Sequence, residues 1–383
     1  MTVPWTAGVT LHCTGCRATE APDLSWYGCA RCGAPFEVHY DDPDGPCLPI
    51  PPEERTDLAA QPTPTLELTS DPGVLLKLEL RNPTGSHKDR FHAVTSAIAR
   101  LAGARGIVTT STGNHGVSCA CHAARDGIPC VVRSTEEIPD PLAVQIAAHG
   151  AKLVRLEPGE RREALRALVD DGWVPATSSD PALTGAGNPY GAEGYRAIAD
   201  ELLVSAGRLP DVIFVPVASG DTLLGVARGL ATAAGRLGQP VPRVASCQPV
   251  GAATVSASLR AGHPVSVESP HSVARSTSDR ATGRLAIEVV ARSGLSITAS
   301  EAEIIRATRD LAANGLYAEA SSALALAGAR VARRNGILGP DALAVAVLTA
   351  NGRGWSETTQ GVFPPPRSVA SDIRELDEPG VGY

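Results

Sequence analysis

Residues 81–90 read RNPTGSHKDR, a stretch that sets one lysine, Lys88, between a turn-rich loop and a helical segment. The apolar run at 74–80 before it predicts a buried strand, and residues 91–101 after it carry apolar side chains at helical spacing. A proline and a glycine punctuate the loop between them. A lysine at the start of a helix is usually solvated. A role as an amine that forms a Schiff base therefore requires other residues that would hold the carbonyl compound.

Residues 111–116, STGNHG, form a second loop, between an expected strand at 106–110 and an expected helix at 117–125. A loop of small residues at such a turn exposes backbone N–H groups that suit a carboxylate. Ordinary connections between strands and helices are also rich in glycine and serine, so this loop alone does not establish a site.

Residues 217–222, VASGDT, follow an expected strand at 211–215 and open an expected helix at 223–234. The start of a helix suits a phosphate group, because its N–H groups and its dipole both favour an anion. A further expected strand, at 344–348, ends in Thr349, whose hydroxyl would give a ring nitrogen a neutral partner. Together the four segments supply the residues that the lysine requires.

In this order the segments resemble the pyridoxal-phosphate enzymes of the tryptophan-synthase β fold, and most closely the threonine synthases. The resemblance covers nearly the whole chain. The residues that it assigns to the cofactor are Lys88 for covalent attachment, Asn114 for the ring hydroxyl, Ala218, Ser219, Gly220, Asp221 and Thr222 for the phosphate, and Thr349 for the pyridine nitrogen. The expected substrate contacts are Ser111, Thr112, His115 and Arg275. His87 is expected either to contact the cofactor phosphate or to be a packed structural histidine.

The composition agrees with an enzyme of two or three structural units, since the chain has 383 residues of which 43% are hydrophobic and 20% are charged. The net charge is -7 and no basic stripe is present, which excludes a nucleic-acid-binding protein. No apolar stretch approaches the roughly 20 residues that span a bilayer, and the first residues lack the regions of a signal peptide. The expected location is the cytoplasm. The expected partners are a small-molecule amino-acid substrate and, by analogy with the family, a second copy in a homodimer.

Strand and helix patterns alternate from residue 106 to 173 and again from 211 to 351, which predicts an α/β fold with two open parallel sheets and the ligand in the cleft between them. The expected domains are a zinc ribbon and linker at 1–45, a large cofactor-binding domain at 46–91 and 190–383, and a smaller α/β domain at 92–189 inserted within it.

Four cysteines form two CxxC pairs, Cys13 with Cys16 and Cys29 with Cys32, separated by twelve residues. This is the spacing of a zinc ribbon, and four thiolates close the coordination sphere without leaving a position for water. The expected ion is therefore structural rather than catalytic. The alternative is a ribbon that holds no metal. Several threonine synthases carry a similar ribbon, which strengthens the resemblance.

The other five cysteines have no metal spacing and are expected to be core residues. They are Cys47, Cys119, Cys121, Cys130 and Cys247.

The departures from threonine synthase fall where substrate would bind. Residues 188–194 read NPYGAEG and resemble the family's NPYRIEG run, so that Gly191 stands where the family has an arginine that contacts the substrate phosphate. His115 follows the asparagine as in serine and threonine dehydratases. Residues 319–323, EASSA, stay close to the family's EPASA segment. The candidates for a replacement anion contact are Arg275, Arg196 and Lys77.

The expected activity is that of a pyridoxal-phosphate lyase that converts O-phospho-L-homoserine and water into L-threonine and phosphate. The neutral hydroxyl of Thr349 favours elimination and replacement over transamination. The alternative is a paralogue that performs β-elimination or β-replacement on serine, threonine or O-phosphoserine. Two further classes stay open: a zinc-dependent interaction protein on an inactive enzyme body, and a catalytic zinc enzyme, which a closed set of four cysteines disfavours.

Overall fold

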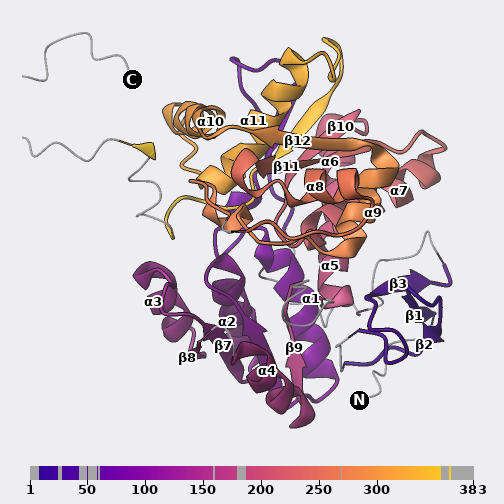
Figure 1. Cartoon of the computed structure of the whole chain (residues 1–383), viewed down its shortest axis with the longest axis vertical. Helices are drawn as coiled ribbons and strands as arrows, with labels where there is room; N and C mark the ends of the chain where they lie inside the picture. Colours follow the sequence, from indigo (N-terminus) through magenta and orange to yellow (C-terminus); the bar gives the residue numbers. More distant parts are fainter. Residues whose placement is uncertain are drawn as a thin grey trace, which may run out of the picture.

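The computed structural model describes residues 8–24, 28–42, 50, 58, 61–157, 160–178, 187–268, 270–354 and 362–363. Figure 1 shows these residues as an upper and a lower α/β lobe with a small β unit at one side. Cys47 and most of the expected linker lie outside the described residues.

The small N-terminal unit is an antiparallel sheet of three strands in the order β2-β1-β3. Its strands are β1 Val9–Cys13, β2 Thr19–Glu20 and β3 Phe36–Tyr40. Alternate residues of β1 are buried, as expected of a strand with one face on a core. That core is shared with the main body, because Val9 and Leu11 belong to one apolar cluster with Ile98 and Tyr190.

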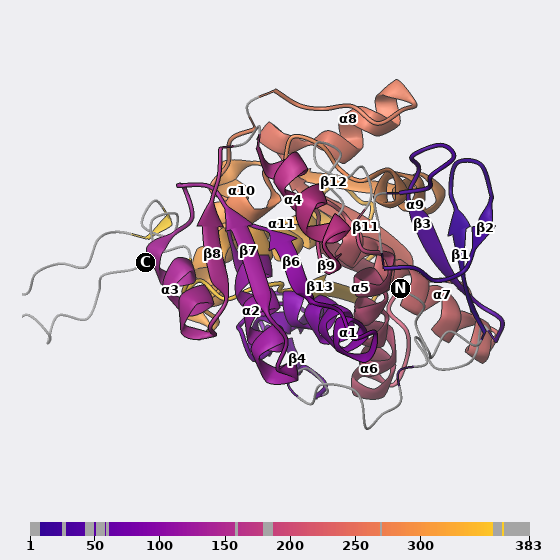
Figure 2. The same ribbon diagram turned by 90° about the horizontal axis from the view of Figure 1, so that it is seen from below.

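The lower lobe contains a parallel sheet of four strands in the order β8-β7-β6-β9, which Figure 2 shows side by side. Its strands are β6 Gly106–Thr110, β7 Cys130–Ser134, β8 Lys152–Arg155 and β9 Trp173–Pro175. The helices of this lobe are α1 Lys88–Leu101, α2 Asn114–Asp126, α3 Asp140–Ala148 and α4 Arg161–Asp170. Each parallel connection needs a crossover, and α2, α3 and α4 supply them.

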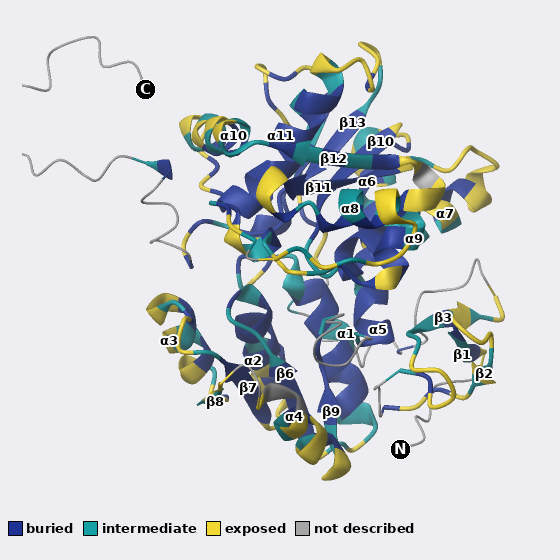
Figure 3. Cartoon of the chain, viewed as in Figure 1, coloured by how far each residue is buried: buried dark blue, intermediate teal, exposed yellow. Residues whose placement is uncertain are grey.

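The upper lobe contains a sheet of six strands in the order β12-β11-β10-β13-β5-β4, in which only β4 runs antiparallel to its neighbour. Its strands are β4 Thr65–Glu67, β5 Val74–Lys77, β10 Val212–Pro216, β11 Arg243–Pro249, β12 Leu295–Ala299 and β13 Ala344–Val347. Strands β10 and β13 are buried throughout, as the burial colours of Figure 3 show for the middle of this lobe. Continuous apolar runs of this kind are what a parallel sheet covered on both faces requires.

Helices α5 Pro189–Glu193, α6 Ala197–Ala206, α7 Asp221–Leu237, α8 Thr254–Ala261, α9 Arg284–Ser293, α10 Glu301–Ala313 and α11 Ala320–Arg334 complete the described helices. Helix α11 is buried on nearly every side and packs against β10, β12 and β13. The small side chains of its alanines permit this close approach to the strands. A helix that is apolar on all sides is typical of a protein core.

The larger sheet thus takes strands from residues 65–77 and 212–347, while the smaller sheet takes its strands from 106–175. The predicted α/β fold with two parallel sheets is confirmed. The domain boundaries stay a prediction: we propose that the two sheets mark the large domain and the domain inserted within it.

The strand expected at 74–80 was too long. It ends at Lys77, and a 3₁₀ turn at Glu79–Arg81 follows. The turn brings the Glu79 side chain, which has no exposed surface, to the guanidinium of Arg90 at 2.6 Å. Arg90 also pairs with Glu201 at 2.7 Å, and Lys77 pairs with the same carboxylate at 2.5 Å. A buried charge requires such partners, and they decide where the strand ends.

Among the described residues, no helix combines the length and the apolar character that crossing a bilayer would require.

Candidate active site

Lys88 is the first residue of α1, at the end of a loop that is joined to the strand end after β13. Asn351 donates its N–H to the Gly85 carbonyl oxygen at 2.9 Å, and His87 donates its N–H to the Thr349 carbonyl oxygen at 2.7 Å. These hydrogen bonds fix the backbone just before the lysine. The amine is therefore positioned by contacts between residues 262 and 266 positions apart in the chain, because both segments follow neighbouring parallel strands, β5 and β13.

The Lys88 side chain keeps some exposed surface although protein groups surround it, as a side chain inside a cleft does. Burial lowers the pKa of Lys88, and the carboxylates of Asp221, Asp279 and Glu319 oppose that shift. A lowered pKa increases the fraction of neutral amine, which is the nucleophilic form.

Thr349 lies at the end of β13 and its hydroxyl is 3.0 Å from that of Ser322 on α11. Ser322 in turn donates to the Ala350 carbonyl oxygen at 2.8 Å and accepts its N–H at 2.6 Å. The Thr349 hydroxyl is therefore held by a neutral partner. Ser322 is a positioning residue that the sequence patterns did not single out.

His87 makes contacts that favour the structural of its two expected roles. Its Nδ1 lies 3.0 Å from the Thr349 carbonyl oxygen, and its ring packs against Tyr195 with 5.6 Å between the ring centroids. Burial lowers the pKa of His87, so its ring stays neutral in this position.

Asn114 begins α2 and reaches across to the other lobe, where its Nδ2 donates to Glu319 at 2.6 Å. The second oxygen of Glu319 accepts the Ser276 hydroxyl at 2.9 Å. Glu319 is 3% exposed and joins the two lobes beside Lys88. In the sequence, Glu319 was singled out only as part of the EASSA segment. Its burial between the two lobes, which no local sequence pattern reveals, makes it a candidate site residue.

The three residues of the 111–116 loop that were expected to contact substrate, Ser111, Thr112 and His115, lie in different environments. The Ser111 hydroxyl accepts the N–H groups of Gly113 and Gly116 at 3.1 and 2.9 Å, so it stabilises the loop itself. Thr112 is partly exposed. His115 lies in the core, with Nε2 2.8 Å from the Ala176 carbonyl oxygen and its ring against His92. These contacts argue against a direct substrate contact by His115.

The stretch 218–222 leads into α7, and its glycine allows the turn. Gly220 has φ +101° and a Cβ there would lie 2.2 Å from Ala286, so only glycine fits. The first turn of α7 has N–H groups that would suit an anion, and binding of a phosphate there stays a prediction. Asp221 adds a carboxylate to the same turn, and it accepts the Ser219 hydroxyl at 2.8 Å. A phosphate would be attracted by the helix start and repelled by this carboxylate.

The expected anion contacts are not gathered in one place. Arg275 is exposed on a short turn before Ser276. Lys77 pairs with Glu201, and Arg196 donates to Glu193 at 2.8 Å, so both cations already have carboxylate partners. A Cβ on Gly191 would lie 2.5 Å from the Phe91 ring, which leaves no room for a larger side chain.

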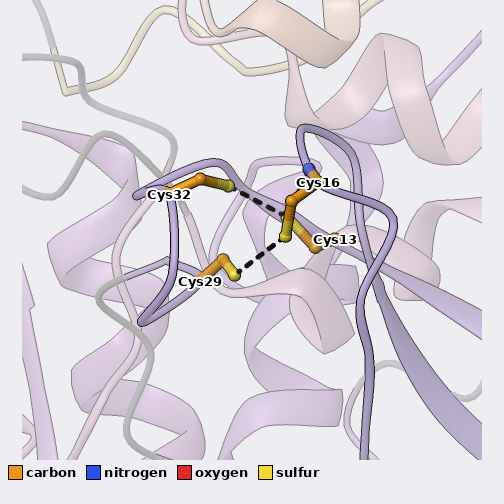
Figure 4. Close-up of side chains that lie close together, drawn as sticks. All are labelled: Cys13, Cys16, Cys29 and Cys32. Carbon is orange, nitrogen blue, oxygen red and sulfur yellow. Dashed lines mark hydrogen bonds between the residues drawn. The ribbon is translucent and has the colours of Figure 1, made fainter.

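The four ribbon cysteines converge, as Figure 4 shows. The Sγ atoms of Cys13 and Cys32 are 3.4 Å apart and those of Cys16 and Cys29 are 3.7 Å apart, and all four lie within 4.8 Å of one another. Four sulfurs around a tetrahedral zinc ion lie about 3.8 Å apart, because each Zn–S bond is about 2.3 Å. The cluster therefore fits zinc, and we propose that it binds one zinc ion in a structural role.

Removal of zinc should destabilise the protein without directly stopping catalysis. We expect one zinc per chain by elemental analysis, and a lower melting temperature for Cys13→Ser and after chelation, because the ribbon core is shared with α1. Cys121→Ser, outside the ribbon, is the matched control. Full metal content in the Cys13→Ser, Cys16→Ser double variant would refute the assignment.

Of the cysteines expected in the core, Cys119, Cys130 and Cys247 are buried, as predicted. Cys121 is only partly buried, which corrects the expectation: it faces a cavity on one side of α2.

Glu319 should make stability depend on pH. Burial raises its pKa from 4.5 to about 7, although Asn114, Ser276 and Lys88 lower it in part. Between these values the folded protein keeps a proton that the unfolded chain has lost. The stabilisation that Glu319 contributes is therefore fully present below pH 4.5, is lost as the pH rises through about 7, and amounts to about 3 kcal/mol in total. Urea unfolding of the cofactor-free protein, compared with Glu319→Gln, should show this slope only in the wild type. An equal slope in both proteins would contradict the assignment, and the exposed Glu163→Gln is the control.

A family model described as "Pyridoxal-phosphate dependent enzyme" matches residues 55–350 of the chain. The threonine synthase of Bacillus sp. (strain ULM1) is 32% identical over 296 residues, which cover 76% of this chain and 81% of that protein. The threonine synthase of Methanosarcina acetivorans is 27% identical over 401 residues, which cover 96% of this chain and 98% of that protein. The second alignment therefore covers nearly the whole chain.

Among solved structures, a fungal L-serine ammonia-lyase from Rhizomucor miehei matches with a TM-score of 0.67 and 22% identity. The match covers 79% of this chain and 99% of that one, and at this identity it shows the common fold alone.

Proposed function

The chain belongs to the family of pyridoxal-phosphate dependent enzymes, as a lyase of that family, and on this premise we propose that it converts O-phospho-L-homoserine and water into L-threonine and phosphate. The observation that carries the proposal is the similarity to threonine synthases over most of the chain, at 32% identity for the Bacillus protein.

The residues of the site fit pyridoxal phosphate. Lys88 offers an amine whose pKa is lowered by burial, and Thr349 offers a neutral hydroxyl. The first turn of α7 offers N–H groups next to Gly220, where a Cβ would not fit. The carboxylate of Asp221, in the first turn of α7, would repel the cofactor phosphate. When bound, the cofactor supplies a ring that withdraws electrons from the carbon that reacts.

We propose that Lys88 would hold the cofactor covalently through its Nζ and that the same amine, once free, would act as the base that takes the α-proton of the substrate. The N–H groups of the 111–114 loop would hold the substrate carboxylate, as an oriented set of donors does at a helix start.

Thr349 would direct the chemistry after proton removal. Its hydroxyl pairs with Ser322 and not with a carboxylate, so no fixed negative charge keeps the pyridine nitrogen protonated. This favours loss of a leaving group over transamination, which supports a lyase that eliminates phosphate.

The alternative is β-elimination or β-replacement on serine, threonine or O-phosphoserine. It is favoured by Gly191, whose packing against Phe91 leaves no space for the arginine of the threonine-synthase motif. The likeness in fold to an L-serine ammonia-lyase is compatible with it.

The test is an assay of purified protein with O-phospho-L-homoserine, and in parallel with O-phospho-L-serine, serine and threonine. Threonine and phosphate in equal amounts would support the proposal. A keto acid from serine or threonine, with no turnover of phosphohomoserine, would replace it with the alternative.

A further inference from the structure

A cavity of about 650 Å³ lies between the lobes, beside the candidate active site but not part of it. The upper lobe contributes the loop before Lys88 and the segments around Tyr317 and Asn351, and the lower lobe contributes α2 and α3. Figure 1 places α3 at the edge of the lower lobe that faces the upper one. The volume is that of a site for a small molecule.

The cavity carries positive charge in a protein whose net charge is -7. Arg81 and Arg353 line it from the upper lobe and His149 from the lower lobe, and none of the described residues that line it is acidic. Among the described residues, neither guanidinium has a carboxylate partner or a side-chain hydrogen bond. Two exposed arginines from different segments, neither with a carboxylate partner among the described residues, thus line one concave surface.

Both arginines are held on ordered backbone. Arg81 ends the 3₁₀ turn that begins with Glu79, whose buried carboxylate pairs with Arg90. Arg353 donates its N–H to the side chain of Asn351 at 3.0 Å. A Cβ on Gly354 would lie 2.5 Å from Leu142, so the same loop packs against α3 and closes one side of the cavity.

The cavity adjoins the site through Asn114, which lines it and also donates to Glu319. Gly85, three residues before Lys88, lines it as well. An anion in the cavity would therefore lie next to the residues that hold the reacting end of the substrate.

We propose that this cavity is a phosphate subsite in which Arg81 and Arg353 bind a phosphate or phosphomonoester group between the lobes. A guanidinium group can bind two phosphate oxygens at once through two hydrogen bonds. None of the described residues that line the cavity is a carboxylate that would repel the phosphate. The group comes either from the substrate ester, which rests on the proposed function, or from free inorganic phosphate, which does not.

The experiment measures binding of inorganic phosphate to the holoenzyme by calorimetry, so that the cofactor already fills its own phosphate site. We expect the Arg81→Gln, Arg353→Gln double variant to bind phosphate at least about tenfold more weakly than the wild type, since each charge-assisted contact is lost. Arg260→Gln, Arg292→Gln is the matched control, because it removes two exposed arginines on α8 and α9 and should leave phosphate affinity unchanged. Equal phosphate affinity in all three proteins, or no binding by the wild type at millimolar phosphate, would overturn the proposal.

The kinetic arm identifies the source of the phosphate. A KM for a phosphorylated substrate that rises about tenfold in the double variant, with kcat little changed, would place the substrate ester in the cavity. Weakened phosphate binding with an unchanged KM would assign the cavity to free phosphate. The calorimetry does not depend on turnover, so a failure of the proposed function would leave its result intact.

Discussion

Lys88→Ala should leave a folded protein whose activity on any accepted substrate is lower by about 10³-fold or more. The amine is lost both as the attachment point and as the proposed base, and these two roles cannot be replaced by water at the same position. The control is Lys152→Ala, since Lys152 is exposed on β8. An activity within tenfold of the wild type would exclude Lys88 from the chemistry.

The same assignment can be tested without turnover. The chain contains only three lysines, Lys77, Lys88 and Lys152. Borohydride reduction of the holoenzyme and peptide mapping should find the cofactor mass on Lys88 alone. Lys77 is fully buried and paired with Glu201, and Lys152 lies on the far edge strand of the small sheet. Label on either of these would refute the predicted site.

Glu79→Ala should destabilise the protein by about 3–5 kcal/mol, because it leaves the buried guanidinium of Arg90 with only part of its counter-charge. Thr63 and Asn82 would lose their acceptor at the same time, since both donate to the Glu79 carboxylate. Urea unfolding gives the measurement. Glu163→Ala, on the exposed face of α4, should change stability by less than about 0.5 kcal/mol.

The effect of Glu79 should also depend on pH. Burial alone would raise its pKa, but Arg90, Thr63 and Lys77 lower it to about 2. The folded pKa is below the unfolded value of 4.5, so the stabilisation is present above pH 4.5 and is lost as the pH falls towards 2. The difference between wild type and Glu79→Ala should shrink across that interval. A difference that is constant with pH would show that the charge of Glu79 contributes nothing.

Much of the fold could be predicted because its signals are local. The strands at 106–110 and 344–347 are apolar runs, and helices α2 and α7 are bounded by glycine at both ends, so local patterns place them within a few residues. Strand β12 and helices α8 and α9 were missed. Strand β12 alternates between buried and partly buried residues at the sheet edge and so lacks the continuous apolar run of the inner strands.

The site could be predicted only in part, for the same physical reason. The small residues in the loops at strand ends indicate Lys88, Asn114 and Thr349 as candidate site residues. Hydrogen bonds between the two lobes leave no comparable pattern in the sequence. Nothing in the sequence near Glu319 shows that Asn114 donates to it, or that His115 would lie in the core against His92. Spacing along the chain does not encode which loop faces which.

The ribbon's apolar contact with α1 has a practical consequence for truncation. Leu11 and Val38 of the ribbon cover Ala97, Ile98 and Tyr190, and Tyr40 donates to Glu193 at 2.9 Å. A chain shortened to begin after residue 42 would present this covered face to water. Exposed apolar faces of this kind drive self-association, so the shortened protein should aggregate during expression even though every predicted active-site residue remained.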